Sequence, residues 1–394
     1  MKILHCCLSS WYVDHYSYQE NILPKMHYLQ GHQVYIVAST ETYIDNKRIG
    51  YLKPSTYQTE YGVPIKRLPY VGIINHFITK KLRIYKDLSE TLNRFSPNVI
   101  FIHGHHFLSI YEIKKYAQKA HGVKIFIDSH CDYLNCARNL LSKNILHKII
   151  YKWCAKTIEP FVSKFYGTLP LRCEFLHKVY GIKKEKIEFL PLGIDDIVIN
   201  SLSEQEKNEK HFHGKYCSPT SLSKKKHFSI VTGGKIDKQK NIIDLMRVIN
   251  MVENDDIKLI IFGSVKDDIR NEFDKLADSN KIFYIGWLKP KEIYRQFLKA
   301  DLAIFPGSHS VLWEQATGCG LPCIFKYTKG IDHVDVGGNC KFLYENTHEE
   351  LKELILRLYN NSDELKKMRQ IAEKKGKDFF AYSNIARISI ENGE

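Results

Sequence analysis

The sequence predicts an α/β protein of two domains, each a parallel sheet with helices wound on both sides. Short apolar segments alternate with amphipathic, helix-like segments along most of the chain, which is the pattern of parallel-sheet folds. A length of 394 residues suits two domains of a typical ~100 to 200 residues each. A polar stretch near the middle interrupts the alternation, which then restarts. We therefore expect two doubly wound domains joined by a linker.

The first predicted domain covers residues 1–197. It opens with an apolar strand over Lys2–Leu8, a helical pattern that ends at Gly31 and a second strand over Gln33–Ser39, which together make a β-α-β unit. The next predicted strand, helix and strand are Asn98–His103, Ser109–His121 and Val123–Asp128. This cadence is typical of a parallel sheet wrapped in helices.

Residues 198–227 are polar and nearly free of apolar side chains, so we expect a linker or an exposed loop there. The second predicted domain covers residues 228–375. Its predicted strands are Phe228–Thr232, Lys258–Phe262, Ile282–Ile285 and Leu302–Phe305, with helices from Asn241, around Ile269–Ala277 and from Lys289. The tail, residues 376–394, reads as helix, and we expect it to pack across the domain junction.

Two such domains suit a reaction between a donor and an acceptor. Open parallel sheets bind ligands at the carboxyl ends of their strands, so a cleft between two sheets can hold two substrates. The fold alone does not fix the chemistry.

Composition excludes several classes of protein. The first residues lack the cleavage site of a secretory signal, and no apolar run approaches the ~18 residues of a membrane span. The ten cysteines lack zinc-site spacing, so we expect free thiols in a cytoplasmic protein. The formal net charge of +14 indicates an anionic partner. Because no nucleic-acid-binding motif is present, we expect no nucleic acid and favour an anionic membrane surface.

The strongest chemical signal is IFPGSHSVLWEQATGCGLPCIF, residues 304–325. A buried strand ends at Phe305, and a helix begins near Ser310 with Glu314 in its first turn. The free amides of a helix start attract phosphate. The Glu314 carboxylate can accept hydrogen bonds from ribose or sugar hydroxyls. The alternative is that Glu314 only interacts with the helix dipole, which is worth roughly 0.3 to 1 kcal/mol.

A second signal is VTGGKIDKQKNIIDLM, residues 231–246. A strand runs into Gly233 and Gly234, where a ligand can approach the backbone closely. Lys235 and Lys240 follow before a helix begins. Two cations at this place can neutralise a diphosphate leaving group as its bond to a sugar breaks. A glycine pair after a strand is by itself a weak motif.

The ordered pieces GGKIDKQKN, IIFGS, YIGWL, ADLAIFPG and WEQATGCGLPCI resemble the nucleotide-binding half of family 4 retaining glycosyltransferases of the group 1 type. The pieces MKILHCC, YLQGHQVYIVAS, SPNVIFIHGHH and LPLGIDD are similar to the acceptor half of that family. The resemblance covers nearly the whole chain. It implies the GT-B fold, two Rossmann-like domains facing across a cleft, and sugar transfer from a nucleoside diphosphate sugar with retention of configuration.

The resemblance also implies roles for single residues. Glu314 matches the second Glu of the family's paired-glutamate motif, and Lys240 matches the lysine on the diphosphate. Lys235 stands where the family usually has arginine, which loses the bidentate fork. Pro306 stands where the first glutamate belongs, so His309 or Ser310 replaces its sugar contacts. The predicted donor-binding residues are Gly233, Gly234, Lys235, Lys240, His309, Ser310, Val311 and Glu314.

In the first domain His130 follows a predicted strand and resembles the family histidine beside the reacting sugar. We expect a catalytic role for His130, together with Glu314 and Lys240. His103 and His105, after the preceding strand, are its rivals for facing the sugar or the acceptor. Tyr18, in the loop where the family has a glycine pair, is a further candidate.

The chain contains no Asp-x-Asp sequence, the usual metal clamp for a nucleotide diphosphate. We therefore expect no metal and no cofactor, with lysines and helix amides neutralising the diphosphate instead. Two segments, Tyr70–Lys86 and Leu140–Lys152, mix large apolar residues with basic ones. Such segments lie in an anionic lipid interface or, equally, are amphipathic helices whose apolar side faces the core.

These observations together predict a glycosyltransferase. It would move a sugar from a UDP-linked donor to a hydroxyl of a glycan or a lipid-linked acceptor, in cell-surface polysaccharide or glycolipid assembly at the inner face of the plasma membrane. Two other classes stay open: a sugar-nucleotide epimerase of the same architecture, and a basic non-enzymatic module that binds lipid or nucleic acid.

Overall fold

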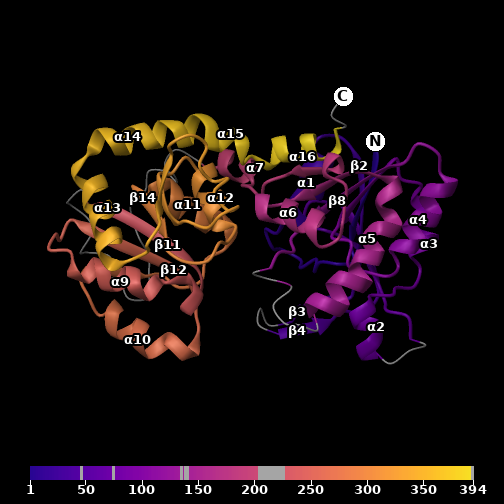
Figure 1. Ribbon diagram of the computed structural model, residues 1–394, viewed down its shortest axis with the longest axis horizontal. Coiled ribbons are helices and arrows are strands. Elements are labelled where there is room, and N and C mark those ends of the chain that lie inside the picture. Colours follow the sequence, from indigo (N-terminus) through magenta and orange to yellow (C-terminus); the bar gives the residue numbers. More distant parts are fainter. Residues whose placement is uncertain (45–47, 73–75, 134–135, 137–141, 203–226, 392–394) are drawn as a thin grey trace. The chain divides into compact units, whose positions relative to one another are not determined.

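The computed structural model describes residues 1–394 except 45–47, 73–75, 134–135, 137–141, 203–226 and 392–394 (Figure 1). The chain divides into two compact units. Unit 1 consists of Met1–Pro191 and Ile385–Glu394, and unit 2 of Leu192–Asn384. The boundary falls at Pro191/Leu192, before the predicted end of the first domain at residue 197. Most of the predicted linker lies outside the described residues.

Unit 1 contains an eight-stranded sheet of order β10-β9-β8-β7-β1-β2-β6-β5. All neighbours pair in parallel except β5 and β6, which are antiparallel at the edge. The strands of the sheet are β1 Lys2–Cys7, β2 Gln33–Ser39, β5 Thr56–Gln58, β6 Pro64–Leu68, β7 Val99–His103, β8 Lys124–Ser129, β9 Val162–Gly167 and β10 Ile187–Phe189. A separate antiparallel pair consists of β3 Glu41–Ile44 and β4 Arg48–Tyr51.

Helices flank this sheet. They are α1 Gln19–Leu29, α2 His76–Leu82, α3 Leu88–Phe95, α4 Ile110–Lys119, a π-helical segment Ser142–Tyr151 that continues into α5 Lys152–Ile158, and α6 Pro170–Lys178. The central strand β7 is buried along its whole length, as a strand covered on both faces must be. The apolar run that predicted this strand is therefore explained by helices on both sides of the sheet.

Unit 2 contains a six-stranded, all-parallel sheet of order β13-β12-β11-β14-β15-β16. Its strands are β11 Phe228–Ile236, β12 Ile257–Val265, β13 Ile282–Tyr284, β14 Leu302–Phe305, β15 Cys323–Lys326 and β16 Cys340–Leu343. Its helices are α7 Asp196–Asn200, α9 Ile242–Met251, α10 Asp267–Ala277, α11 Pro290–Lys299, α12 Leu312–Gly318, α13 His348–Asn360, α14 Ser362–Ile371 and α15 Lys377–Phe379. The last helix, α16 Tyr382–Ile390, begins in unit 2 and ends in unit 1.

The predicted architecture of two doubly wound α/β domains is confirmed. In each sheet the strand order reverses once along the chain. The reversal lies between β1 and β7 in unit 1, and between β11 and β14 in unit 2. In open sheets of this kind, ligands bind outside the carboxyl ends of the strands at the reversal. The segments that follow these four strands are therefore the places to examine for a site.

One predicted boundary is wrong in an informative way. Strand β11 does not stop before Gly233 but continues to Ile236, paired residue by residue with β12. At Gly263 of β12, a Cβ atom would lie 1.9 Å from the backbone oxygen of Gly234. Both glycines have positive φ, +114° at Gly234 and +121° at Gly263. Gly263 therefore allows β12 to approach the backbone of Gly234 closely.

This close approach predicts a large penalty for Gly263→Ala. Backbone strain of ~1–3 kcal/mol and overpacking of ~1–3 kcal/mol should together lower the free energy of unfolding of unit 2 by roughly 3 kcal/mol. Gly286→Ala is the control, because Gly286 also has positive φ but has open space around its Cβ position, so we expect only about 1–2 kcal/mol there. Urea unfolding followed by tryptophan fluorescence measures both losses, and equal losses would contradict this account.

Candidate functional site

In unit 2 the segments after β11 and β14 are joined by Lys240. The Lys240 ammonium donates hydrogen bonds to the backbone oxygens of Ser308, at 2.7 Å, and His309, at 2.9 Å. The backbone amide of Ser308 in turn donates to the oxygen of Gln239, at 2.8 Å. The strand order reverses between β11 and β14, which is where a ligand is expected. Lys240 therefore holds the loop after β14 at this position.

Gly307 permits this contact. A Cβ atom at Gly307 would lie 2.3 Å from the carbonyl carbon of Lys240 and 2.4 Å from the oxygen of Gln239. Only a residue without a side chain fits against this backbone. The glycine that breaks the strand in the sequence therefore also sets the distance between the two loops.

Glu314 lies at the start of α12, as predicted, but it is fully buried. Its Oε1 accepts hydrogen bonds from His309 Nε2, at 2.8 Å, and from His333 Nε2, at 2.9 Å. Burial alone would raise the pKa of the Glu314 carboxyl, but the two neighbouring imidazoles hold it well below its usual range. Glu314 is therefore an ionised carboxylate that anchors two histidines.

The other oxygen of Glu314 has a different environment. Oε2 is buried and has no hydrogen-bond partner among the described residues. A buried carboxylate oxygen without a partner is costly. This oxygen is the part of the Glu314 carboxylate that the two histidines do not use.

The other predicted donor-binding residues differ in exposure. Lys235 is exposed, and Lys240 is half-buried, so that burial lowers the pKa of its ammonium while Asp237 partly offsets this effect. The partly exposed residues are Gly234, His309, Ser310 and Val311, whereas Gly233 is buried within β11. Gly234 lies beside α12, since a Cβ there would be 3.1 Å from Leu312. The predicted motifs after β11 and β14 are thus adjacent in space.

In unit 1 the predicted histidines gather at the carboxyl ends of β7 and β8, which are paired neighbours. His130 directly follows β8, and its side chain keeps 32% of its exposure. Its Nε2 lies 3.7 Å from Oδ1 of Asp128, while His103 Nδ1 lies 2.7 Å from Oδ2 of the same carboxylate. Asp128 is the last residue of a predicted strand, and no sequence motif marks it.

His103 and His105 do not fit the expected sugar-facing role, because both side chains have no exposed surface. His103 is bound to Asp128. His105 packs edge-on against Tyr180, and burial lowers its pKa to about 3. Tyr18 is 42% exposed at the start of α1, so its side chain remains accessible to a ligand.

His309, Glu314 and His333 also form a possible metal site. Their ligand atoms all lie within 4.8 Å of one another, the one such group found in the part of the chain that the structure describes. Two imidazoles and a carboxylate are ligands that transition metals accept. The sequence did not predict His333 as a site residue, because its distance along the chain from Glu314 matches no metal-binding motif.

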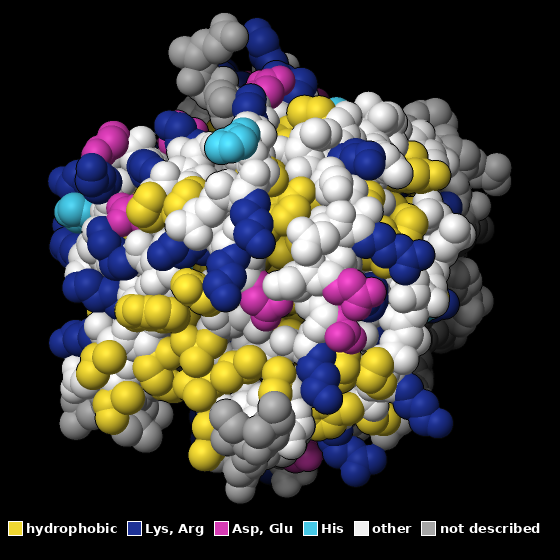
Figure 2. Space-filling model, turned by 90° about the vertical axis from the view of Figure 1, so that its right-hand side faces the viewer, with side chains coloured by type: hydrophobic (Ala, Val, Ile, Leu, Met, Phe, Trp, Pro, Cys, Tyr) yellow, Lys and Arg dark blue, Asp and Glu magenta, His cyan; other side chains and the backbone are white. Residues whose placement is uncertain are grey.

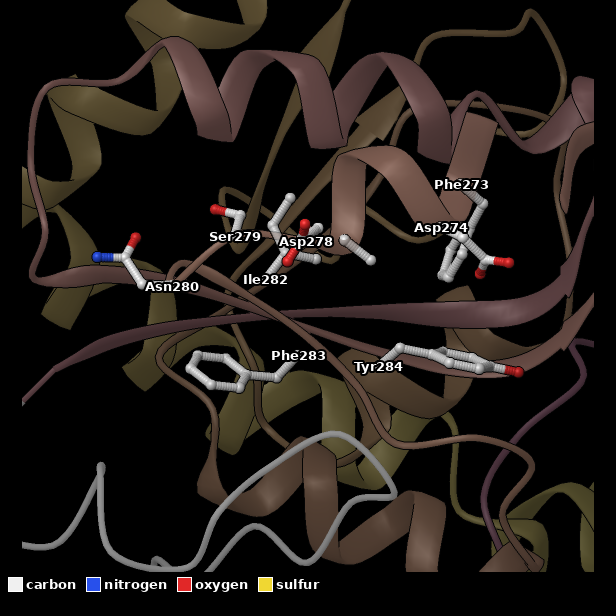
Figure 3. A pocket seen from close by; sticks show the side chains of 9 residues that line it. Phe273, Asp274, Asp278, Ser279, Asn280, Ile282, Phe283 and Tyr284 are labelled. Carbon is white, nitrogen blue, oxygen red and sulfur yellow. The ribbon is translucent and has the colours of Figure 1, made fainter. Parts of the chain in front are cut away.

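One hollow of unit 2 is not formed by these residues. It has a volume of about 600 Å³ and is lined by the end of α10, by β13 and by the turn between them (Figure 3). Its lining includes Asp274 and Asp278 but none of the predicted donor-binding residues. Two carboxylates would repel a diphosphate. A second hollow, of about 730 Å³, lies in unit 1 around Tyr35 and Arg94 and also lacks the predicted residues. The site therefore rests on the strand-end residues.

The fold and these strand-end residues define a two-domain protein of the GT-B type. Residues 218–375 match the family "Glycosyl transferases group 1". The match covers the whole of the second predicted domain, residues 228–375. The similarity to this family therefore concerns that domain and not the whole chain.

A sequence relative is described as "Uncharacterized 41.2 kDa protein in cps region" of Klebsiella pneumoniae. It is 29% identical to this chain over 147 residues, which are 36% of this chain and 37% of the relative. The chain thus matches little more than a third of the relative's length.

Solved structures share the fold over nearly the whole chain. Sucrose-phosphate synthase of Thermosynechococcus elongatus has a TM-score of 0.68 and 12% identity, covering 98% of this chain and 97% of that chain. HepE of Anabaena in complex with UDP has a TM-score of 0.66 and 12% identity, covering 98% of each chain. UDP-GlcNAc 2-epimerase of Neisseria meningitidis bound to UDP-GlcNAc has a TM-score of 0.61 and 13% identity, covering 100% and 99%. At these identities the likeness shows the GT-B fold.

The lowered pKa of Glu314 predicts how stability depends on pH. A carboxyl whose pKa is depressed in the folded state stabilises the protein above its unfolded pKa of ~4.3 and loses that contribution as the pH falls. The free energy of unfolding of wild-type unit 2 should therefore fall between about pH 6 and pH 3. In Glu314→Gln this fall should be smaller, as measured by urea unfolding at each pH. Glu349→Gln, which removes an exposed carboxylate of the same unit, is the matched control. An equal change in both variants would show that the Glu314 contacts contribute nothing.

Proposed function

We propose that this protein is a retaining glycosyltransferase that transfers a sugar from a UDP-linked donor to a hydroxyl of a glycan or a lipid-linked acceptor. The observation that carries the proposal is the Lys240-bound loop of unit 2, which places cations, imidazoles and Glu314 at the reversal of strand order. Group 1 glycosyltransferases match this part of the chain. HepE, which shares the fold, binds UDP in its solved structure, and this supports a UDP-linked donor.

The chemistry follows from the charges. Breaking the bond between a sugar and a diphosphate leaves negative charge on the leaving group, and fixed cations lower the barrier to this step. Lys235 is exposed after the glycine pair, and we assign it to the phosphates. Lys240 is held in place by two carbonyl oxygens, so it needs little reorganisation when a phosphate arrives. We assign the donor sugar to His309, Ser310 and the free oxygen of Glu314, and the reacting sugar to His130.

The acceptor side of the proposal includes a membrane surface. Along the helical segment from Ser142 to Ile158, three apolar side chains are exposed at intervals of four residues: Ile145 at 45%, Ile149 at 62% and Trp153 at 50%. Lys148, Lys152 and Lys156 are exposed between them. Exposed apolar residues beside lysines suit the headgroup region of an anionic bilayer.

The rest of the chain fits a peripheral protein. None of the described helices is long and apolar enough to cross a membrane. The face shown in Figure 2 carries many basic side chains around apolar ones and few acidic ones. The relative from a cps region supports a role in cell-surface polysaccharide assembly.

A sugar-nucleotide epimerase is the second candidate, because the Neisseria enzyme shares the fold over the whole chain. The two functions differ in their need for an acceptor. An epimerase converts its nucleotide sugar alone, whereas a transferase releases the nucleoside diphosphate only when it moves the sugar. Product analysis without acceptor distinguishes them.

Lys240→Ala tests the donor site. We expect thermal stabilisation of the protein by UDP to disappear and turnover to fall by about 100-fold or more, because a positioned charge on the leaving group is lost. Turnover of the wild-type protein should survive EDTA, because in this proposal lysines and not a metal neutralise the diphosphate. Lys238→Ala is the matched control, since Lys238 is an exposed lysine of the same short helix. Unchanged UDP binding and turnover in Lys240→Ala would remove this residue from the site.

Trp153→Asp tests the membrane surface. We expect its binding to vesicles of phosphatidylethanolamine and phosphatidylglycerol to fall by about tenfold, which corresponds to ~1.4 kcal/mol, as measured by cosedimentation. The matched control is Trp287→Asp, because Trp287 is 61% exposed in unit 2. Absence of wild-type binding, or an equal loss in the control, would refute the membrane assignment.

A further inference from the structure

Three buried histidines of unit 1 form a continuous hydrogen-bonded chain. His27 Nε2 lies 2.8 Å from the backbone oxygen of Ala386 in α16, and His27 Nδ1 lies 2.9 Å from His5 Nε2. His5 Nδ1 lies 3.0 Å from His103 Nε2, and His103 Nδ1 lies 2.7 Å from Asp128 Oδ2. The three imidazoles and the carboxylate have no exposed surface. The chain thus runs from α16 through α1, β1 and β7 to the end of β8.

Between His103 and Ala386 only one direction of proton donation satisfies the hydrogen bonds. A carbonyl oxygen can only accept, so His27 Nε2 must carry a proton and its Nδ1 must accept from His5. The hydroxyl of Ser389 donates its one proton to the same carbonyl oxygen, so toward His27 Nε2, 3.2 Å away, it can only accept, which keeps this direction. His5 must then accept from Nε2 of His103 by the same argument. The three bonds from His103 through His5 and His27 to the Ala386 oxygen therefore all point toward Ala386.

The direction of the bonds determines the charge at the Asp128 end. With Nε2 of His103 already protonated, its Nδ1 either carries a second proton and donates to an ionised Asp128, or accepts from a protonated Asp128. Burial disfavours both charged forms, but Asp128 raises the pKa of His103, while His103 and His130 lower the pKa of Asp128. The pair is thus an imidazolium and a carboxylate.

The remaining two histidines of the chain are neutral. Burial lowers the pKa of His5 well below its usual range, and it lowers that of His27 to about 3. Asp128 therefore keeps its negative charge in the core. The His103 imidazolium compensates this charge, and hydrogen bonds fix the dipoles of the neutral His5 and His27 rings. Its position depends on contacts that reach across the whole unit.

The second oxygen of Asp128 faces the predicted catalytic histidine. Oδ1 lies 3.7 Å from His130 Nε2, an electrostatic contact between the carboxylate and the imidazole. His130 is half-buried, whereas Asp128 is wholly enclosed.

We propose that Asp128 is a positioning residue for His130, and that the His27–His5–His103 chain holds this carboxylate ionised and oriented. The proposal rests on the proposed function, because it assigns His130 to the reacting sugar. A merely structural role would not require this arrangement, since apolar side chains of similar volume usually stabilise a core at least as well as a buried ion pair. Removing one partner of the pair, however, leaves the other charge uncompensated.

The proton arrangement is tested first, without any substrate. In ¹⁵N spectra of histidine-labelled protein, we expect both nitrogens of His103 to be protonated at neutral pH, and His5 and His27 to be protonated at Nε2 only. In Asp128→Asn, the Asn amide donates to Nδ1 of His103, so that ring should become neutral while the direction of the chain is kept. A neutral His103 in the wild-type protein would overturn the proposal.

The positioning role is tested by kinetics of sugar transfer. We expect Asp128→Asn to lower kcat about 10- to 100-fold with KM changed less than about threefold, because orientation and not binding is lost. Glu159→Gln is the matched control. Glu159, like Asp128, is a buried carboxylate with a cationic partner, in its case Lys156, but it lies before the amino end of β9. Melting temperatures of both variants separate loss of activity from loss of folding.

The outcomes separate this inference from the proposed function. If the wild-type protein transfers no sugar, the proposed function fails, whereas the spectra still decide the proton arrangement. If the wild type is active and His130→Ala is not, full activity of a folded Asp128→Asn would overturn the positioning role. A drop in kcat equal to that of Glu159→Gln would overturn it as well.

Discussion

A buried carboxylate that must stay paired with imidazoles organises the candidate site in each unit. Removing a charge from water is costly unless a partner compensates it. Glu314 meets this requirement through His309 and His333, which fixes the loop before α12 to the segment after β15. Asp128 meets it through His103, which ties the end of β8 to β7. Both carboxylates thus determine the conformation of strand-end segments that would otherwise be free to move.

Local signals in the sequence were enough to predict two doubly wound units and the strand ends at which the candidate site of unit 2 lies. Apolar runs ended by Pro or Gly placed β14 correctly from Leu302 to Phe305, and charge after glycine located Lys235 and Lys240. Such patterns depend on neighbours within a few residues. The parallel arrangement then brings the ends of β11 and β14 together without further information.

Contacts between distant segments were not visible in the sequence. His333 meets Glu314 only because β15 returns beside β14, and Gly234 lies within a strand because Gly263 of β12 makes room for it. The strand-end rule placed His103 correctly along the chain but could not show that its ring points into the core. His5 looked like one more residue of an apolar strand. Which way a side chain faces, and which ring it meets, depends on packing across the sheet.

The return of α16 to unit 1 has a consequence for biosynthesis. Domains usually fold in order as they leave the ribosome, the first before the second. Here unit 1 includes Ile385–Glu394, and His27 takes its hydrogen-bond acceptor from Ala386. The first unit therefore cannot complete its core until the whole of unit 2 has been translated, so a prematurely terminated chain would expose unfinished interior to chaperones and proteases.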